Sequence, residues 1–194
     1  MDTFVIEPAQ RRDAAVILEL IREIAEYEKM SDCVEATEEM IAENGFDRGG
    51  AQVLLAKENG VPVGFALFFE NFSTFKGKSG IYLEDLFVRE EKRGKGYGKA
   101  LFQAVARTAK ERGAGRMEWA CLDWNEPSIR FYLAMGAQPL SEWTTYRLDE
   151  AALAAQYARR RLPENPDQLH SLLLAEGDLA PGELDVPEEW LRRL

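Results

Sequence analysis

The sequence of 194 residues contains only two cysteines, one histidine and no long hydrophobic run. Cys33 and Cys121 are too few for a disulfide framework and are typical of the reducing cytoplasm. With His170 as the single histidine, no His/Cys/carboxylate cluster has the spacing of metal ligands, so we expect no metal. No apolar stretch approaches the roughly 20 residues that span a bilayer. The start, MDTFVIEPAQ, lacks the basic end and apolar core of a signal peptide. We therefore expect a cytoplasmic protein without membrane contact.

Basic residues are fewer than acidic ones, 24 against 34, so the formal net charge is -10. Such a protein repels nucleic acid and anionic membranes and attracts cations, so we expect no nucleic-acid partner. The acidic residues crowd one segment, with Glu19, Glu23, Glu26, Glu28, Asp32 and Glu35. Two interpretations stay open for this segment. It is either a solvated helix face that provides solubility, or a field that draws a cationic substrate.

Hydrophobic periodicity predicts an α/β protein with a mixed, mostly antiparallel sheet flanked by helices. We expect strands at 3–7, 51–57, 61–70, 81–89, 116–122 and 139–148, and helices at 13–30, 37–45, 97–112 and 126–135. Asn59-Gly60 predicts a tight hairpin, and residues 71–80 predict a polar loop. Composition changes near residue 149, first to an alanine-rich helix at 151–162 and then to proline-punctuated sequence. We therefore expect a domain at 1–148 and a C-terminal helical extension at 149–194.

The stretch RGKGYG, residues 93–98, places three glycines and two cations between an apolar strand and an amphipathic helix. Backbone N–H groups at a helix start lack intrahelical partners and carry the positive end of the helix dipole. A glycine-rich loop leading into that end forms a cradle for phosphate oxygens. The spacing lacks the Gly-Lys-Ser/Thr of a P-loop, and the loop does not follow the first strand as in a dinucleotide fold. A turn with loosely placed glycines is the alternative.

Three stretches in this order, LEDLFV, RGKGYG and WNEPSIRFY, resemble the spermidine/spermine N-acetyltransferases of the GNAT superfamily. Arg93-x-x-Gly96-x-Gly98 is similar to the superfamily's acetyl-CoA signature, and the resemblance covers roughly residues 1–148. It implies a GNAT fold whose central sheet is split by a cofactor cleft, acetyl-CoA as cosubstrate, a small cationic amine as acceptor, and a homodimer.

The resemblance also implies roles for individual residues. Pantetheine would bind to the backbone of Leu86, Phe87 and Val88. The pyrophosphate would bind to residues of the glycine loop, namely Arg93, Gly94, Lys95, Gly96, Tyr97, Gly98 and Lys99. Asn125 and Ser128 would make further contacts with the cofactor. For the substrate the resemblance implies Tyr27, Glu28, Glu84, Glu118, Trp119 and Ala120, and for catalysis Tyr132 and Glu84. The chain departs from the family at Thr144, where an acidic residue binds the distant ammonium; Glu142 lies two positions away.

The implied chemistry is direct attack of the amine on the thioester in a ternary complex. Glu84 would take the amine proton through water, and Tyr132 would protonate the leaving thiolate. The alternative to a catalytic role is a salt bridge at a strand edge for Glu84, and a place in the core beside Phe131 for Tyr132. A Cys121 nucleophile is disfavoured because no histidine lies near it in sequence. Other acceptors, such as a thialysine-like amino acid, another small amine or a protein amine, stay open, as does a non-catalytic acetyl-CoA-binding module.

Overall fold

The computed structural model describes residues 3–159, which fall into two compact units that divide between Ala134 and Met135. The second unit contains helix α5 (Glu150–Arg159), whose first turn is capped by Asp149: its Oδ1 accepts from the backbone N–H of Ala152 at 2.8 Å. The expected alanine-rich helix is thus confirmed as far as its described part reaches. The rest of the expected extension, with His170, lies outside the described residues.

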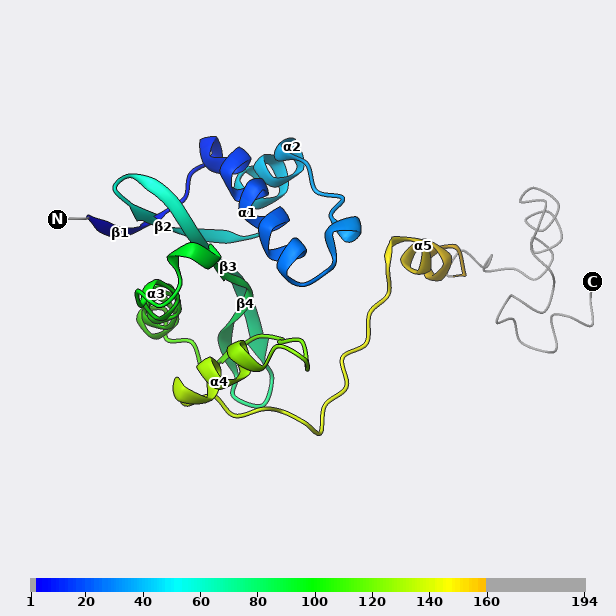
Figure 1. Ribbon diagram of the computed structural model, residues 1–194. Coiled ribbons are helices and arrows are strands. Elements are labelled where there is room, and N and C mark those ends of the chain that lie inside the picture. Colours follow the sequence, from blue (N-terminus) through cyan, green and yellow to red (C-terminus); the bar gives the residue numbers. More distant parts are fainter. Residues whose placement is uncertain (1–2, 160–194) are drawn as a thin grey trace, which may run out of the picture. The chain divides into compact units, whose positions relative to one another are not determined.

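The first unit is built on an open five-stranded sheet with the order β1-β2-β3-β4-β5. Its strands are β1 (Phe4–Pro8), β2 (Gln52–Glu58), β3 (Val61–Ser73), β4 (Lys78–Val88) and β5 (Met117–Glu118). The first four strands pair antiparallel, whereas β4 and β5 pair parallel. This confirms the α/β class and the mixed, mostly antiparallel sheet (Figure 1).

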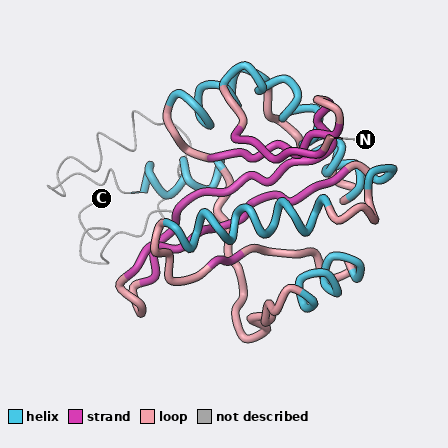
Figure 2. Tube along the Cα trace, turned by 90° about the vertical axis from the view of Figure 1, so that its left-hand side faces the viewer, coloured by secondary structure: helices cyan, strands magenta, loops and turns pink. Residues whose placement is uncertain are grey.

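Helices α1 (Ala14–Tyr27) and α3 (Tyr97–Glu111) pack on this sheet. The other helices of the unit are α2 (Glu38–Met40, continued by a π-helix at Ile41–Asp47), which packs against α1, and α4 (Glu126–Ala134). In Figure 1, α1 and α3 lie on opposite sides of the strands, and Figure 2 shows α3 running along the sheet. Because side chains alternate along a strand, each face needs its own helical cover.

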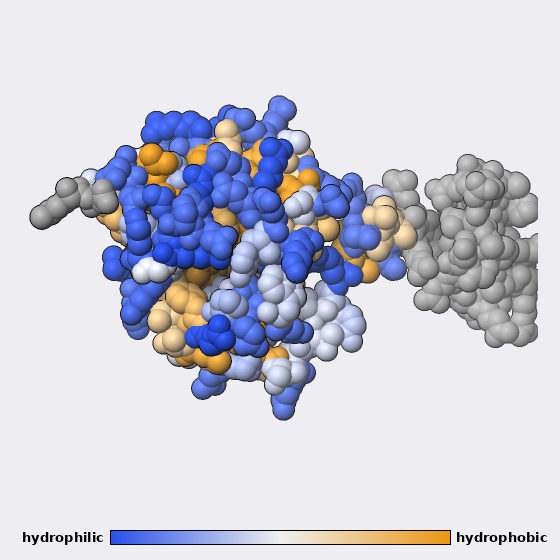
Figure 3. Space-filling view, in the orientation of Figure 1, coloured by the Kyte–Doolittle hydropathy of each residue, from blue (hydrophilic) through white to orange (hydrophobic). Residues whose placement is uncertain are grey.

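The core follows this division. Ile17 and Leu20 of α1 are fully buried against one face, in a cluster with Phe65, while Leu101 and Val105 of α3 are fully buried as well. Charged residues occupy the outer faces, and Figure 3 shows mainly hydrophilic surface with small apolar patches on the first unit.

Most predicted elements are confirmed, including the hairpin at Asn59-Gly60, whose φ angles of 54° and 81° match a tight turn. Thr37 caps α2, since its Oγ1 accepts from the N–H of Met40 at 3.2 Å. The expected end of that helix at Gly45 is wrong, because a π-helical segment continues it to Asp47.

Three expectations about strands and loops are wrong. Residues 71–80 are not a loop, because β3 and β4 stay paired to Ser73↔Lys78 and leave only a short turn. The strand expected at 116–122 is reduced to two residues, and residues 139–148 form no strand. Strand propensity in a sequence does not provide a partner for the ladder.

Strands β4 and β5 separate early. They pair only at Ile81↔Met117 and Tyr82↔Glu118, so from Leu83 on β4 has a strand partner within the first unit on its β3 side alone. A β-bulge follows directly, because Leu67 faces Asp85 and Phe68 faces Leu83, which leaves Glu84 as the extra residue. Bulges re-aim side chains and often accompany active sites.

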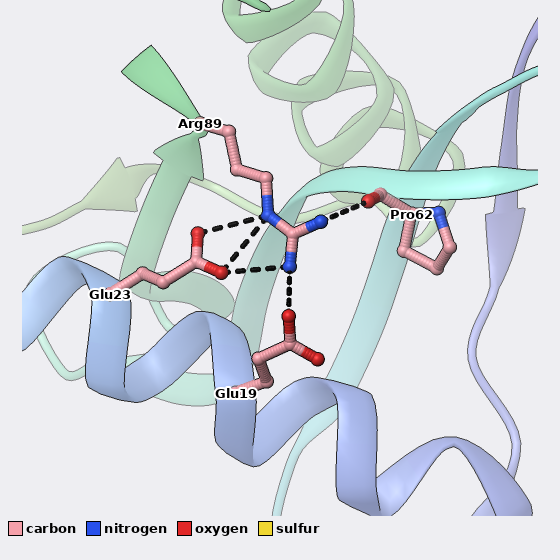
Figure 4. A network of polar contacts seen from close by, with 4 residues as sticks. All are labelled: Glu19, Glu23, Pro62 and Arg89. Carbon is pink, nitrogen blue, oxygen red and sulfur yellow. Dashed lines mark hydrogen bonds and ion pairs between the residues drawn. The ribbon is translucent and has the colours of Figure 1, made fainter. Parts of the chain in front are cut away.

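Arg89, which follows β4, ties the end of the strand to α1 (Figure 4). Its Nε lies 3.0 Å from both carboxylate oxygens of Glu23, a second nitrogen binds Glu19, and a third donates to the carbonyl of Pro62 at 3.1 Å. These carboxylates raise the pKa of Arg89. The contacts fix the strand end from which the glycine loop departs.

Candidate active site

The glycine loop has the geometry of an anion cradle. Gly94 and Gly96 have φ angles of 78° and 85°, in the left-handed region that other residues rarely adopt. Gly96 is the N-cap of α3, and no side chain caps that helix. Gly98 is helical, and a Cβ there would meet only Val88 Cγ2, at an ordinary 3.8 Å. The chain's own packing therefore does not demand glycine at 98, which favours a ligand that approaches the backbone.

The cationic side chains of this loop point in different directions. Lys95 Nζ lies 2.7 Å from Glu58 Oε1, and Lys99 is exposed. Arg93 donates through Nε to the carbonyl of Val88 at 3.0 Å, and its guanidinium lies 4.5 Å from the ring centre of Tyr27. The charge of Arg93 thus lies over the end of α1, so the loop's backbone and lysines are what remain for an anion.

Asn125 joins the end of α1 to the start of α4. Its side chain is buried, and Oδ1 accepts from Tyr27 Oη at 3.1 Å and from the N–H of Ser128 at 3.3 Å. The second bond caps the start of α4. The ring of Trp124 lies 6.1 Å from that of Tyr27. Predicted cofactor-binding and substrate-binding residues are thereby neighbours.

Two consecutive carboxylates lie where β4 has lost its β5 neighbour. Glu84, the bulged residue, is exposed, whereas Asp85 is partly buried. Burial, with the charges of Glu84 and Glu28, raises the pKa of Asp85 to about 7. A carboxylate with such a pKa is matched to proton transfer near neutral pH. The resemblance singled out Glu84, and the structure adds Asp85 beside it.

Tyr132 lies in an aromatic cluster between α3 and α4. Its ring centre is 5.0 Å from that of Trp119 and 6.1 Å from that of Phe102, which Phe131 also contacts. Both aromatic residues of α4 therefore pack inward. Burial, followed by the nearby Cys121, Glu28 and Asp85, raises the pKa of Tyr132. The phenol is therefore neutral at working pH, the form that can donate a hydrogen bond.

Glu28, the C-cap of α1, links these groups electrostatically. Burial raises the pKa of Glu28 itself, and its charge contributes to the raised pKa values of Asp85, Tyr132 and Cys121. Groups from α1, β4, α4 and the segment after β5 therefore lie within electrostatic reach of one another. The two partly buried carboxylates of Glu28 and Asp85, with the exposed Glu84 beside Asp85, favour a cation.

The other predicted substrate residues are more dispersed. Glu118 forms an ion pair with Arg116 at 2.8 Å, and Ala120 is exposed. Glu142 and Thr144 belong to the second unit, so their relation to the site stays a prediction. Leu86 is partly buried and Phe87 and Val88 are buried at the end of β4, Val88 accepting from Arg93.

Within residues 3–159, no group of three or more His, Cys, Asp and Glu side chains is arranged to hold a metal ion. In the same part of the chain, no helix has the length and apolar character needed to cross a membrane. Cys33 and Cys121 are both free thiols.

Sequence reasoning missed Asp85 and Glu58. The signal for Asp85 was present as two adjacent acids inside the apolar run IYLEDLFV, but only the bulge shows that its carboxylate is the more buried of the two. Glu58, a charged residue just before a hairpin turn, gives no comparable signal.

A strand pair that separates beside a glycine-rich helix start, next to acidic groups and a neutral tyrosine, is an arrangement that suits transfer of an acyl group to an amine. A model of the acetyltransferase (GNAT) family matches residues 15–137, and the chain belongs to that family. Acetyltransferases of this family use acetyl-CoA and transfer its acetyl group to an amine.

The chain is similar to several N-acetyltransferases. Thialysine N-epsilon-acetyltransferase of Bos taurus is 38% identical over 161 residues, which cover 77% of this chain and 94% of that protein. L-ornithine N5-acetyltransferase of Arabidopsis thaliana is 50% identical over 95 residues, 49% of this chain and 42% of that protein. Spermidine/spermine N(1)-acetyltransferase-like protein 1 of Homo sapiens is 31% identical over 164 residues, 79% of this chain and 24% of that protein.

Solved structures share the fold. An integron cassette protein from the mobile metagenome of V. cholerae matches with a TM-score of 0.68 at 26% identity, covering 79% of this chain and 97% of that one. An aminoglycoside N-acetyltransferase, AAC(6')-Iy, in complex with CoA matches with a TM-score of 0.63 at 18% identity, covering 76% and 96% of the two chains.

Replacing Asp85 with asparagine should make the protein more stable above neutral pH. An aspartate titrates near 3.9 in an unfolded chain and at about 7 here, so the folded state holds the extra proton between these values. Stability should therefore fall as pH rises from about 4 to about 7, by up to about 4 kcal/mol. Urea unfolding of Asp85→Asn should give a flatter pH profile, equal to the wild type near pH ~4 and above it near pH ~8. An unchanged profile would show that Asp85 ionises normally.

Proposed function

We propose that this protein transfers the acetyl group of acetyl-CoA to a primary amine of a small diamine or polyamine, by direct attack in a ternary complex. The observation that carries this proposal is the grouping of Glu28 and Asp85 near Tyr132, with Glu84 beside Asp85, on a chain of the acetyltransferase family. A second ammonium on the acceptor would meet the acidic field, which the first ammonium alone cannot neutralise.

The loop at 93–99 suits the anionic part of acetyl-CoA. The start of α3 has no side-chain cap, and the backbone at Gly98 is open to approach. Lys95 and Lys99 add positive charge, and the edge of β4 at residues 86–88 has no β5 partner. When bound, acetyl-CoA supplies the acyl group as an activated thioester.

The chain's own groups can handle both protons of the reaction. An alkyl ammonium has a pKa of about 10.4, so at neutral pH fewer than ~1 in 10³ acceptor molecules carry the lone pair needed for attack. Asp85 is the residue whose pKa, about 7, suits removal of that proton. Glu84 attracts the cation from its exposed position. Tyr132 donates a proton to the departing sulfur.

A dibasic amino acid is the second candidate acceptor. Its support is Lys29, which directly follows Glu28 and places Nζ 5.8 Å from the ring centre of Trp124, beside Tyr27. A cation at the rim of an acidic site provides a partner for a carboxylate. The bovine and plant relatives bear names of amino-acid acetyltransferases, whereas the human relative is named after polyamines.

A thiol-release assay over spermidine, spermine, putrescine, ornithine, thialysine and a lysine peptide tests the acceptor. We expect turnover with at least one acceptor that carries two cationic groups, and little with a monoamine of equal length. Lys29→Gln should lower kcat/KM about tenfold for ornithine and thialysine and leave putrescine unchanged. Acetylation of the peptide alone would reject the small-amine proposal.

Removal of either proposed proton-transfer group should reduce turnover strongly. Asp85→Asn and Tyr132→Phe should each lower kcat by about 10²-fold or more, with CoA affinity by calorimetry near that of the wild type. Glu84→Gln serves as the comparison, and its main effect should be a raised KM for the amine. If Glu84→Gln loses more kcat than Asp85→Asn, Glu84 and not Asp85 is the base.

Gly98→Ala separates a ligand-binding role from a folding role. Alanine in this helical position should raise the free energy of unfolding by about 0.5–1 kcal/mol, because it lowers the entropy of the unfolded chain. The added methyl group should nevertheless raise KM for acetyl-CoA at least about tenfold, because it holds phosphate off the backbone. Thermal unfolding and initial rates measure both effects. Unchanged KM would place the diphosphate elsewhere.

A further inference from the structure

Glu58 is a buried charged residue to which the proposed acetyl transfer assigns no role. It ends β2, directly before the Asn59-Gly60 turn, and is only 6% exposed. An ionised carboxylate is rarely buried unless donors satisfy it. Its placement therefore indicates a specific task.

Within residues 3–159, three donors to this carboxylate come from one short segment. Glu58 Oε2 accepts from Lys92 Nζ, and Oε1 accepts from Lys95 Nζ at 2.7 Å and from Tyr97 Oη at 2.6 Å. Lys92 precedes the glycine loop, Lys95 lies inside it, and Tyr97 begins α3. These bonds lower the pKa of Glu58 to about 2, so the carboxylate stays charged over the working pH range.

The neighbouring strand fixes the same segment from a second side. Phe4 of β1 is the register partner of Glu58, and its ring is stacked on that of Tyr97 with centroids 4.1 Å apart. Tyr97 is thereby held through both its ring and its hydroxyl. The first residue of α3 consequently has its position set by the sheet.

These contacts matter because the glycine loop by itself can adopt many conformations. Two left-handed glycines, Gly94 and Gly96, give the unbound segment many conformations, and ordering them on binding costs affinity. Contacts at both ends of the loop remove part of that cost in advance. Lys95, whose side chain is 45% exposed, is the donor best placed to turn from Glu58 to an arriving phosphate, while Lys92 and Tyr97 keep their bonds.

We propose that Glu58 is a positioning residue that holds the 92–97 segment in the conformation that receives the diphosphate of acetyl-CoA. The inference rests on the proposed function, because it assumes that this loop binds the cosubstrate. Glu58 opposes the attraction between the loop and an anion, since it neutralises part of the lysine charge. Its net effect is favourable only if ordering outweighs that neutralisation.

Calorimetric titration of CoA into Glu58→Gln at two ionic strengths separates these effects. At about 0.5 M salt, where screening shortens the Debye length to roughly 4 Å, the ordering effect dominates, and Kd should rise about tenfold. The dependence of Kd on salt should become steeper, because two lysines lose their partner. In steady state, KM for acetyl-CoA should rise in parallel, with kcat and the KM of the amine within about twofold. Equal or tighter binding at high salt would overturn the proposal.

Two further variants keep the result interpretable. Glu7→Gln removes another lysine–carboxylate pair, Glu7 with Lys57 at 2.5 Å on β1 and β2, and should leave CoA binding unchanged. Tyr97→Phe removes one hydrogen bond to Glu58 without a charge change and should weaken CoA binding about threefold, which decides the matter if Glu58→Gln does not fold. Absence of CoA binding to the wild type would refute the proposed function instead, whereas wild-type binding with unaffected variants would refute the role of Glu58 alone.

Discussion

The early separation of β4 from β5 is the constraint on which the candidate site depends. A strand inside a sheet has its N–H and C=O groups paired on both edges, whereas β4 is paired with β5 only at Ile81 and Tyr82. Beyond that point, one edge of β4 offers backbone groups that a ligand with amides can pair with as a strand would. The same stretch carries Glu84 and Asp85. Ligand edge and acidic groups therefore belong to one short segment, and Arg89 ties its end to α1.

Charge is distributed so that two ligands of opposite sign have separate places. Glu28 and Asp85 form the acidic part, while the lysines of the glycine loop form the basic part, partly neutralised by Glu58. Arg93 lies between the two and, because it binds the Val88 carbonyl and covers Tyr27, brings positive charge to the boundary. This separation of charge would allow the proposed cationic acceptor and the anionic cosubstrate to bind without competing for the same groups.

The sequence was sufficient to predict what depends on local pattern. Alternating apolar residues, the Asn59-Gly60 turn and the glycine loop each have a physical cause within a few residues, and the structure has all three. It was insufficient wherever pairing partners decide. Residues 71–80 look like a loop because they are polar, yet cross-strand bonds hold them in β3 and β4. The bulge at Glu84 cannot be predicted from the sequence either. Alternation along a strand predicts that one of residues 84 and 85 is buried and the other exposed, but it does not say which.

The electrostatics of Cys121 also bear on the choice between direct attack and an acetyl-cysteine intermediate. A cysteine attacks a thioester as its thiolate, which proteins favour by placing cations, a helix N-terminus or a histidine beside it. Cys121 has the opposite surroundings: burial, Glu28 and Asp123 raise the pKa of its thiol. The carboxylates that disfavour this thiolate are the kind of group that attracts an ammonium and accepts its proton. One arrangement of charges thus disfavours the covalent route and favours the direct one, in which the acceptor amine itself is the nucleophile.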